Sequence, residues 1–174
     1  MTPPDEDPVA ALGAALVLTN ATAKLNRKRI VRSTLHDANY HVAMIACAMR
    51  LHAEGDAKRI LSAWLKLLQF VAARPSLLPR LQEYADSRRR NDLAKWALMP
   101  RGYMGDQTHD GVVDFLVAAG LLQQGGDYLE AGPRYAALEA VAVAVEGAQM
   151  FSGERMILDA LRAIKPNKTM LGGS

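Results

Sequence analysis

The chain has 174 residues, of which 50% are hydrophobic and 22% charged, a composition typical of one globular domain or two small ones sharing a core. This composition excludes collagen-like chains, disordered chains and disulfide scaffolds. The longest apolar stretch, residues 9–18, is half the ~20 residues of a membrane-spanning helix, and Asp5, Glu6 and Asp7 precede it where an export signal carries bases. A single Cys47 rules out an internal disulfide and zinc sites built on paired cysteines. We therefore expect a cytoplasmic protein that does not cross a membrane.

The net charge of +3 hides a separation of charge along the chain. Residues 1–23 carry −3, residues 24–105 carry +10, residues 106–146 carry −6, and the remainder carries +2. Regions of opposite sign favour a partner with a complementary surface, because such fields steer association over a Debye length of ~10 Å. The alternative is that both regions are ordinary solvated helix faces.

Apolar residues at helical spacing predict helices throughout the first half of the chain. The first runs from about residue 8 to 23 and starts at Asp7 and Pro8, an N-cap acid followed by a proline. A long second helix is expected to begin at Ser33 and to stop at Gly55.

Three more helices are expected before residue 100. Asp56 is expected to cap the first of them, whose apolar stripe includes Ile60 and Leu61. Ser76 and Asn91 are expected to begin the other two, which are shorter.

The pattern changes after residue 102. Residues 108–119 predict a helix of about three turns, with Gly120 as a left-handed residue at its end. The runs 121–124 and 127–131 alternate around Gly125-Gly126, which predicts a β-hairpin with a type I′ turn and positive φ at both glycines. Two last helices are expected to follow this hairpin, over about 134–146 and 152–164.

The order of elements from residue 91 to 146 resembles that of a winged-helix domain. It is carried by the helix Val112–Ala119 that ends in Gly120-Leu121 and by the hairpin and helix within Gln123–Leu138, about a third of the chain. The resemblance implies a fold and does not by itself imply a function.

With this resemblance, the sequence predicts a mainly α protein. We expect an N-terminal helical bundle over residues 1–90 and a winged-helix domain with one short β-hairpin over residues 91–147. A C-terminal helix over residues 148–166 and a flexible tail over residues 167–174 complete the expected organisation.

The charges of the winged segment are unsuited to reading DNA. In winged-helix regulators the helix before the wing lies in the major groove, where basic and amide side chains meet bases and phosphates. Here that helix offers Asp106, Asp110 and Asp114, and the wing adds Asp127 and Glu130 without a cation. Phosphates would repel this surface. Asp106, Asp110 and Asp114 are therefore predicted to bind a protein partner.

The whole chain also resembles the small middle subunit of Lamassu, or ABC three-component, anti-phage systems. The resemblance is carried by Leu65–Pro75, Trp96–Tyr103 and the winged segment. It implies a non-enzymatic adaptor in a hetero-complex, between an ATPase like those of structural maintenance of chromosomes (SMC) and an effector subunit. It assigns no role to individual residues. The alternative is a winged-helix transcription regulator that dimerises through its terminal helices, which would call for a cationic recognition helix.

Motifs for catalysis are missing from the sequence. Neither a phosphate-binding loop nor the context of a hydrolase serine occurs, so we expect no enzyme and no cofactor. His109, beside Asp110, is interpreted as part of a helix-capping neighbourhood. Cys47 lies among small apolar residues and is interpreted as a buried hydrophobe.

His36, Asp37, His41, Cys47 and His52 fall in one predicted helix. The histidine and cysteine spacings of five, six and five place these side chains on different faces, whereas ligands at i and i+4 would share one. Asp37 and His41 do share a face, which favours a hydrogen-bonded pair that fixes helix packing. A catalytic or metal role is the alternative.

Two basic clusters are predicted to contact nucleic acid. The first contains Lys24, Arg27, Lys28, Arg29 and Arg32, and the second contains Arg88, Arg89 and Arg90. In a helix, Lys24, Lys28 and Arg32 would lie on one side. Such clusters hold a DNA backbone without reading its sequence. The alternative is that they are solvated or pair with the acids of residues 106–146.

Overall fold

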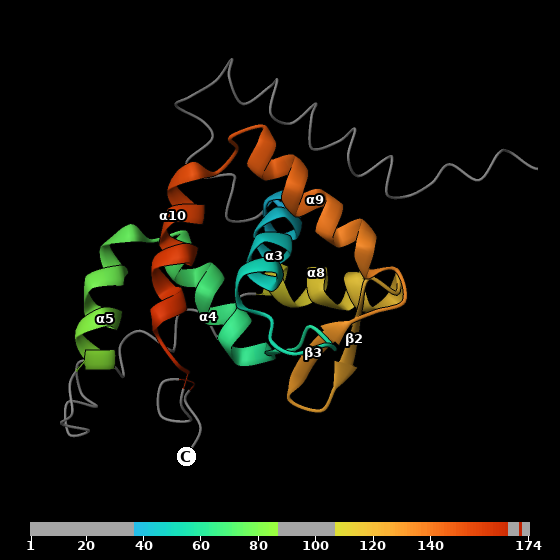
Figure 1. Ribbon diagram of the computed structural model, residues 1–174, viewed down its shortest axis with the longest axis horizontal. Helices are drawn as coiled ribbons and strands as arrows, with labels where there is room; N and C mark the ends of the chain where they lie inside the picture. Colours follow the sequence, from blue (N-terminus) through green and yellow to red (C-terminus); the bar gives the residue numbers. More distant parts are fainter. Residues whose placement is uncertain (1–36, 87–106, 167–170, 172–174) are drawn as a thin grey trace, which may run out of the picture.

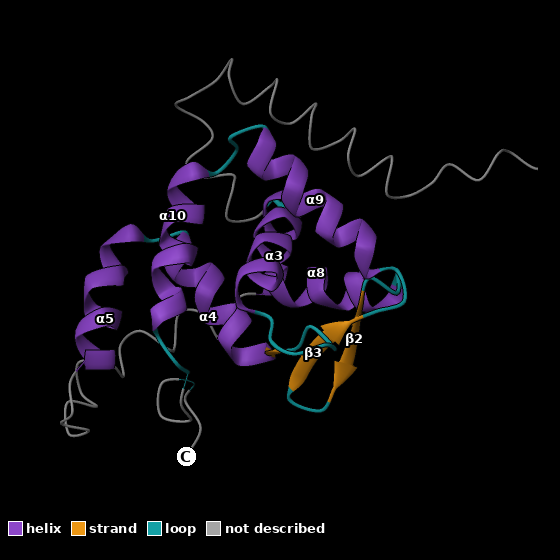
Figure 2. Cartoon of the chain, in the orientation of Figure 1, coloured by secondary structure: helices purple, strands orange, loops and turns teal. Residues whose placement is uncertain are grey.

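Helices make up most of the computed structural model, which describes residues 37–86, 107–166 and 171 (Figures 1 and 2). The helices are α3 (Ala38–His52), α4 (Ser62–Ala72), α5 (Leu78–Asp86), α8 (Gln107–Ala118), α9 (Tyr135–Gly147) and α10 (Ser152–Ala160). The strands are β1 (Ile60–Leu61), β2 (Leu122–Gly125) and β3 (Tyr128–Ala131), and 3-10 turns cover Pro75–Leu77 and Leu161–Ala163. The prediction of a mainly α protein with one short hairpin is confirmed.

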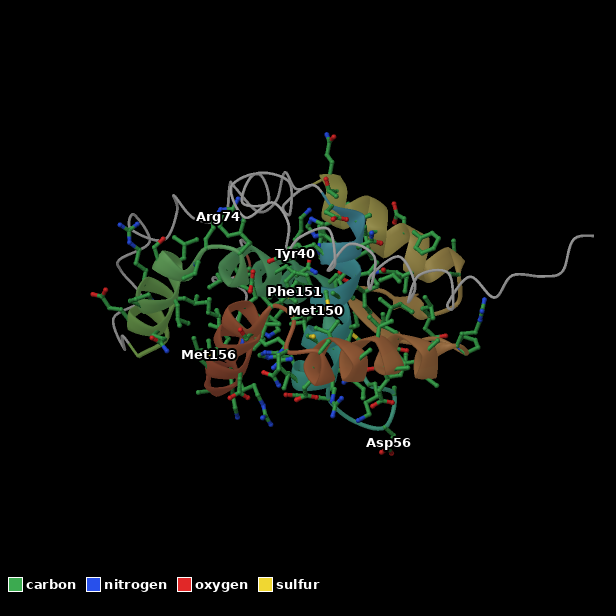
Figure 3. The ribbon with its side chains drawn as sticks, turned by 90° about the horizontal axis from the view of Figure 1, so that it is seen from above. Tyr40, Asp56, Arg74, Met150, Phe151 and Met156 are labelled. Carbon is green, nitrogen blue, oxygen red and sulfur yellow. The ribbon has the colours of Figure 1, made fainter. Side chains whose placement is uncertain are left out.

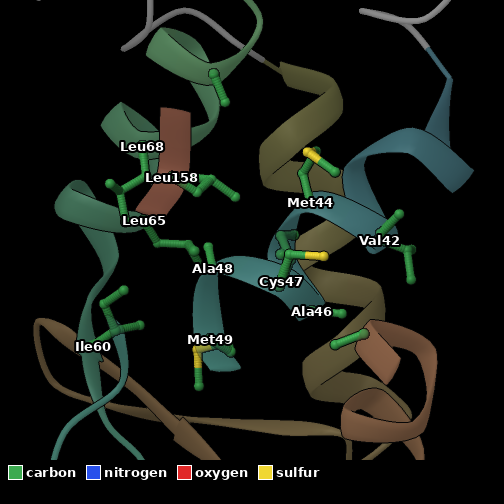
Figure 4. Close-up of a cluster of buried hydrophobic side chains, with 14 of the residues drawn as sticks. Val42, Met44, Ala46, Cys47, Ala48, Met49, Ile60, Leu65, Leu68 and Leu158 are labelled. Carbon is green, nitrogen blue, oxygen red and sulfur yellow. The ribbon is translucent and has the colours of Figure 1, made fainter. Parts of the chain in front are cut away.

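Helix α3 runs through the middle of the core. Its residues from Tyr40 to Met49 are all buried, and most of them are small or apolar. A helix that is apolar all round belongs to a protein interior. Helices α4, α8, α9 and α10 pack against it. Figure 4 shows Leu65 and Leu68 of α4 with Leu158 of α10, grouped beside Ala48.

A strand from the first half of the chain completes the sheet. The three antiparallel strands have the order β1-β3-β2. Strands β2 and β3 form the hairpin, and β1 pairs along the other edge of β3 with Ile60 opposite Leu129. Leu122 and Leu129 are buried and tie the hairpin to the helices.

The prediction of a helix capped by Asp56 was wrong. Asp56 is exposed in a turn and points away from the molecule (Figure 3). Glu54 and Arg59 exchange backbone hydrogen bonds of 2.9 and 3.0 Å across this turn, and α4 begins only at Ser62. Ile60 is buried, as a residue of an apolar helix stripe would be, so its periodicity does not reveal the strand. The strand forms because Ile60 and Leu61 pair with β3, and such tertiary pairing overrides local preference.

The start of α3 also differs from the prediction at Ser33. The described helix begins after Asp37, whose carboxylate accepts a 2.9 Å hydrogen bond from the backbone N–H of Asn39. An acid in this position satisfies an N–H that has no partner within the helix. The helix ends at His52, and Gly55 beyond it has a positive φ of 71°.

Glycines shape the connections around the hairpin. Gly120 has a φ of +72°, as its predicted place at the end of α8 requires. The two-residue loop is Gly126-Asp127 rather than Gly125-Gly126, and of these residues only Gly126 has a positive φ, as in a type II′ turn. A Cβ on Gly132 would collide with the carbonyl oxygen of Gly120, because the two backbones cross there.

Buried residues on both sides of the segment 87–106 form one hydrophobic cluster. The predicted bundle contributes α3, α4 and β1, the predicted winged-helix region contributes α8, the hairpin and α9, and the predicted C-terminal helix contributes α10. The elements of all three regions therefore share a core.

Two predicted helices, over residues 8–23 and from Asn91 onward, lie outside the described residues, as does nearly all of the tail 167–174. In the part of the chain that is described, no helix has the length and apolar character needed to cross a membrane.

Candidate functional site

Helix α8 presents an acidic and apolar surface to solvent, which we call the α8 face. It consists of Asp110, Asp114 and Phe115, all exposed. Val112 and Leu116 lie on the opposite side of the helix and are buried in the core. The Phe115 side chain is 49% exposed, which is unusual for a large aromatic residue. The structure thus exposes two of the three predicted partner-binding acids one turn apart on α8, with the exposed Phe115 ring next to Asp114 in the sequence.

A lysine from α4 holds one of these acids. The Lys66 Nζ donates to both carboxylate oxygens of Asp110 at 2.7 Å, and its side chain is 13% exposed against 56% for Asp110. The sequence does not predict this pair because the two residues lie on different helices. Asp114 makes no ion pair with any described residue and α8 contains no lysine or arginine, so the acidity of the face centres on Asp114.

Several predicted site residues lie outside the described part of the chain. They are Lys24, Arg27, Lys28, Arg29, Arg32, Arg88, Arg89, Arg90, Asp106 and His36. Both predicted nucleic-acid-binding clusters are among them.

Below the α8 face, two histidines and a glutamine form a buried polar cluster. His41 of α3, Gln69 of α4 and His109 of α8 are 2–4% exposed. The Gln69 Nε2 donates to the His41 carbonyl at 3.0 Å, which identifies the other side-chain atom as the acceptor Oε1. The Nδ1 atoms of His41, at 3.2 Å, and of His109 both donate to this Oε1. One amide therefore connects three helices.

This cluster corrects two predictions. Asp37 does not pair with the ring of His41, since its carboxylate caps its own helix at Asn39 while the ring reaches Gln69. His109 is a core residue rather than part of a capping neighbourhood. The overlooked signal was Gln69 itself, a polar residue within the apolar stripe of α4.

The remaining members of the predicted His and Cys group serve packing. Cys47 is 5% exposed, as predicted, and burial raises its pKa to about 11. The His52 Nε2 donates to the Leu158 carbonyl at 2.8 Å, which ties α3 to α10. Within the described residues, no three His, Cys, Asp or Glu side chains gather in a way that could hold a metal ion.

The core fixes how the α8 face is presented. His109 anchors α8 from the inside, and Asp110 binds α4 at the surface. Comparisons with protein-family models, with curated proteins and with solved structures returned no match for the chain.

Proposed function

We propose that the chain is a non-enzymatic winged-helix adaptor that binds another protein through the α8 face. The support for the winged-helix assignment is the order α3, β1, α4, α8, β2, β3, with α5 inserted after α4, together with the antiparallel strand order β1-β3-β2. On this proposal the module begins at α3 rather than at residue 91, and the hairpin of β2 and β3 is its wing.

The observation that carries the proposal is the chemistry of α8. A helix that reads a groove lies against phosphates, and each phosphate contact needs a cation. Helix α8 has none, and it exposes Asp110, Asp114 and Phe115. Protein interfaces in contrast favour an aromatic side chain at the centre with polar groups around it. The α8 face has this composition.

The partner class follows from the face and from the resemblance to Lamassu middle subunits. The acids favour a partner surface that carries cations, because opposite charges are complementary across an interface. The exposed Phe115 favours an apolar pocket in the same partner surface. We propose that this surface belongs to an SMC-like ATPase or to an effector subunit, in a cytoplasmic complex that defends against phage. Contacts to the DNA backbone through the basic clusters 24–32 and 88–90 would be independent of DNA sequence.

The test is a pull-down with tagged full-length chain from cells that produce it, compared between variants. Asp114→Lys and Phe115→Ala should each lose the heterologous partner while changing stability by no more than about 0.5 kcal/mol. Glu139→Lys is the matched control, because Glu139 is an exposed acid on α9. Asp114 is a cleaner choice than Asp110, whose reversal would also set a second lysine beside Lys66.

A titration with duplex DNA at two salt concentrations distinguishes the adaptor from the alternative, a winged-helix transcription regulator. Tight binding to one operator that is lost on Gln107→Ala or Thr108→Ala, with complex assembly unchanged in Asp114→Lys, would overturn the adaptor and favour a transcription regulator. For the adaptor, Asp114→Lys should leave DNA affinity unchanged or raise it.

A further inference from the structure

A hollow of about 620 Å³ lies where the ends of α3 and α10 meet β1 and the hairpin. In Figure 1 the C-terminal end of α10 and the hairpin of β2 and β3 both lie in the lower part of the molecule. Three cations line the hollow, Arg59 beside β1 and Arg162 and Lys165 after α10, against one acid, Glu54. We call it the cationic hollow. The cations come from distant parts of the sequence, so the fold itself brings them together.

Among the described residues, acids neutralise these cations only weakly. Arg59 and Lys165 make no ion pair with any described residue. Arg162 contacts Asp159 at 3.3 Å, but both side chains are well exposed, at 59% and 65%, and an exposed pair of this kind contributes little. Cations gathered around a concave surface focus a positive potential into it. The cationic hollow therefore attracts anions.

Arg59 is held in a position suited to binding. Its guanidinium lies over the Tyr128 ring, 5.0 Å from the centroid, and Tyr128 is fixed in β3 opposite Leu61 of β1. A stacked guanidinium is oriented by the ring while its N–H groups remain available for a planar or tetrahedral oxyanion. The hollow is thus preorganised at one edge and lined by the exposed cations Arg162 and Lys165 at the other.

We propose that the cationic hollow binds a phosphate-bearing ligand, with Arg59, Arg162 and Lys165 contacting phosphate oxygens. Its volume falls within the ~300–1,000 Å³ of ligand pockets. The phosphate comes from a free nucleotide or from the backbone of a nucleic acid, since both present the same oxyanions. The site involves other residues than the α8 face and does not depend on the function proposed for that face.

The experiment titrates the full chain with two probes, pyrophosphate by calorimetry and a short fluorescein-labelled single-stranded oligonucleotide by anisotropy. The test variant combines Arg59→Gln with Lys165→Gln. The control combines Lys58→Gln with Arg80→Gln, which removes two exposed cations that do not line the hollow. The test variant should bind at least one probe about ten-fold more weakly than wild type, and the control should stay within about two-fold.

The two probes distinguish the source of the phosphate. A selective loss of pyrophosphate binding assigns the site to a free nucleotide. A selective loss of oligonucleotide binding assigns it to nucleic acid, and the slope of log affinity against log salt should then fall by ~1.4, since each neutralised phosphate of a single strand contributes ~0.7. If the double variant unfolds, the exposed Arg162→Gln replaces it. No binding of either probe, or equal weakening in test and control variants, overturns the proposal.

Discussion

Replacing Gln69 by leucine should lower the free energy of unfolding by about 3 kcal/mol. The change removes the Oε1 that accepts from His41 and His109, and the Nε2 that donates to the His41 carbonyl. Gln69 is 4% exposed, so water does not replace these bonds. The His41 ring, the His109 ring and the His41 carbonyl each lose a hydrogen-bond partner, which lowers the free energy of unfolding by about 5 kcal/mol in total. Burying a leucine in place of the amide raises it by about 2 kcal/mol.

Urea unfolding measures this loss. With a slope of about 2 kcal/mol per molar urea, the midpoint should fall by about 1.5 M. Gln123→Leu is the control, because Gln123 is exposed on β2 and such a change shifts stability by about 0.5 kcal/mol or less. If Gln69→Leu unfolded at the same midpoint as the wild type, the histidine and glutamine hydrogen bonds would contribute nothing to stability, contrary to this prediction.

Three other expectations concern buried groups. Tyr40→Phe should leave stability unchanged or raise it by up to about 1 kcal/mol, because the buried hydroxyl has no hydrogen-bond partner among the described residues while the edge-to-face contact with Phe151 at 5.3 Å is kept (Figure 3). A clear loss in urea unfolding would contradict this. Cys47, with its pKa raised by burial, should react with iodoacetamide at least about 100-fold more slowly in the native protein than in urea, and equal rates by mass spectrometry would count against it. Burial lowers the pKa of His52 below its ordinary value of 6.5, so below that pH the folded state binds fewer protons than the unfolded state. The stability contributed by neutral His52 should therefore be fully present above pH 6.5 and should be lost as the pH falls through the pKa of His52 in the folded state. His52→Gln, which keeps a donor for Leu158, should reduce the difference in unfolding free energy between pH 7 and pH 5, and an unchanged difference would refute this assignment.

The sequence predicted best what local signals specify. The end of α8 at Gly120 and the hairpin were predictable, because a left-handed glycine and two alternating runs act over a few residues. Strand β1 was not, since Ile60 and Leu61 are too few to show alternation and their partner β3 lies far along the chain. Their apolar side chains fit the helical spacing of the residues that follow, so they were predicted as part of a helix.

In the candidate site, too, features that depend on neighbouring residues were predictable, and contacts between distant parts of the chain were not. The shared face of Asp110 and Asp114 follows from their spacing on one helix. The pairing of Lys66 with Asp110 depends on how α4 and α8 pack, which spacing does not reveal. The cations of the hollow were not predicted for a related reason, because Arg59 lies about a hundred residues before Arg162 and Lys165 in the sequence.

The pairing of β1 with β3 also governs the order of events during synthesis. The ribosome releases α3 and β1 well before Leu129, the residue opposite Ile60, has been made. Until α8, α9 and α10 emerge, the buried residues 40–49 of α3 have no complete cover. Chains that stop before the hairpin should therefore aggregate or be degraded, because exposed apolar helix and an unpaired strand edge favour association. The described core can therefore be complete only after α10 has been made.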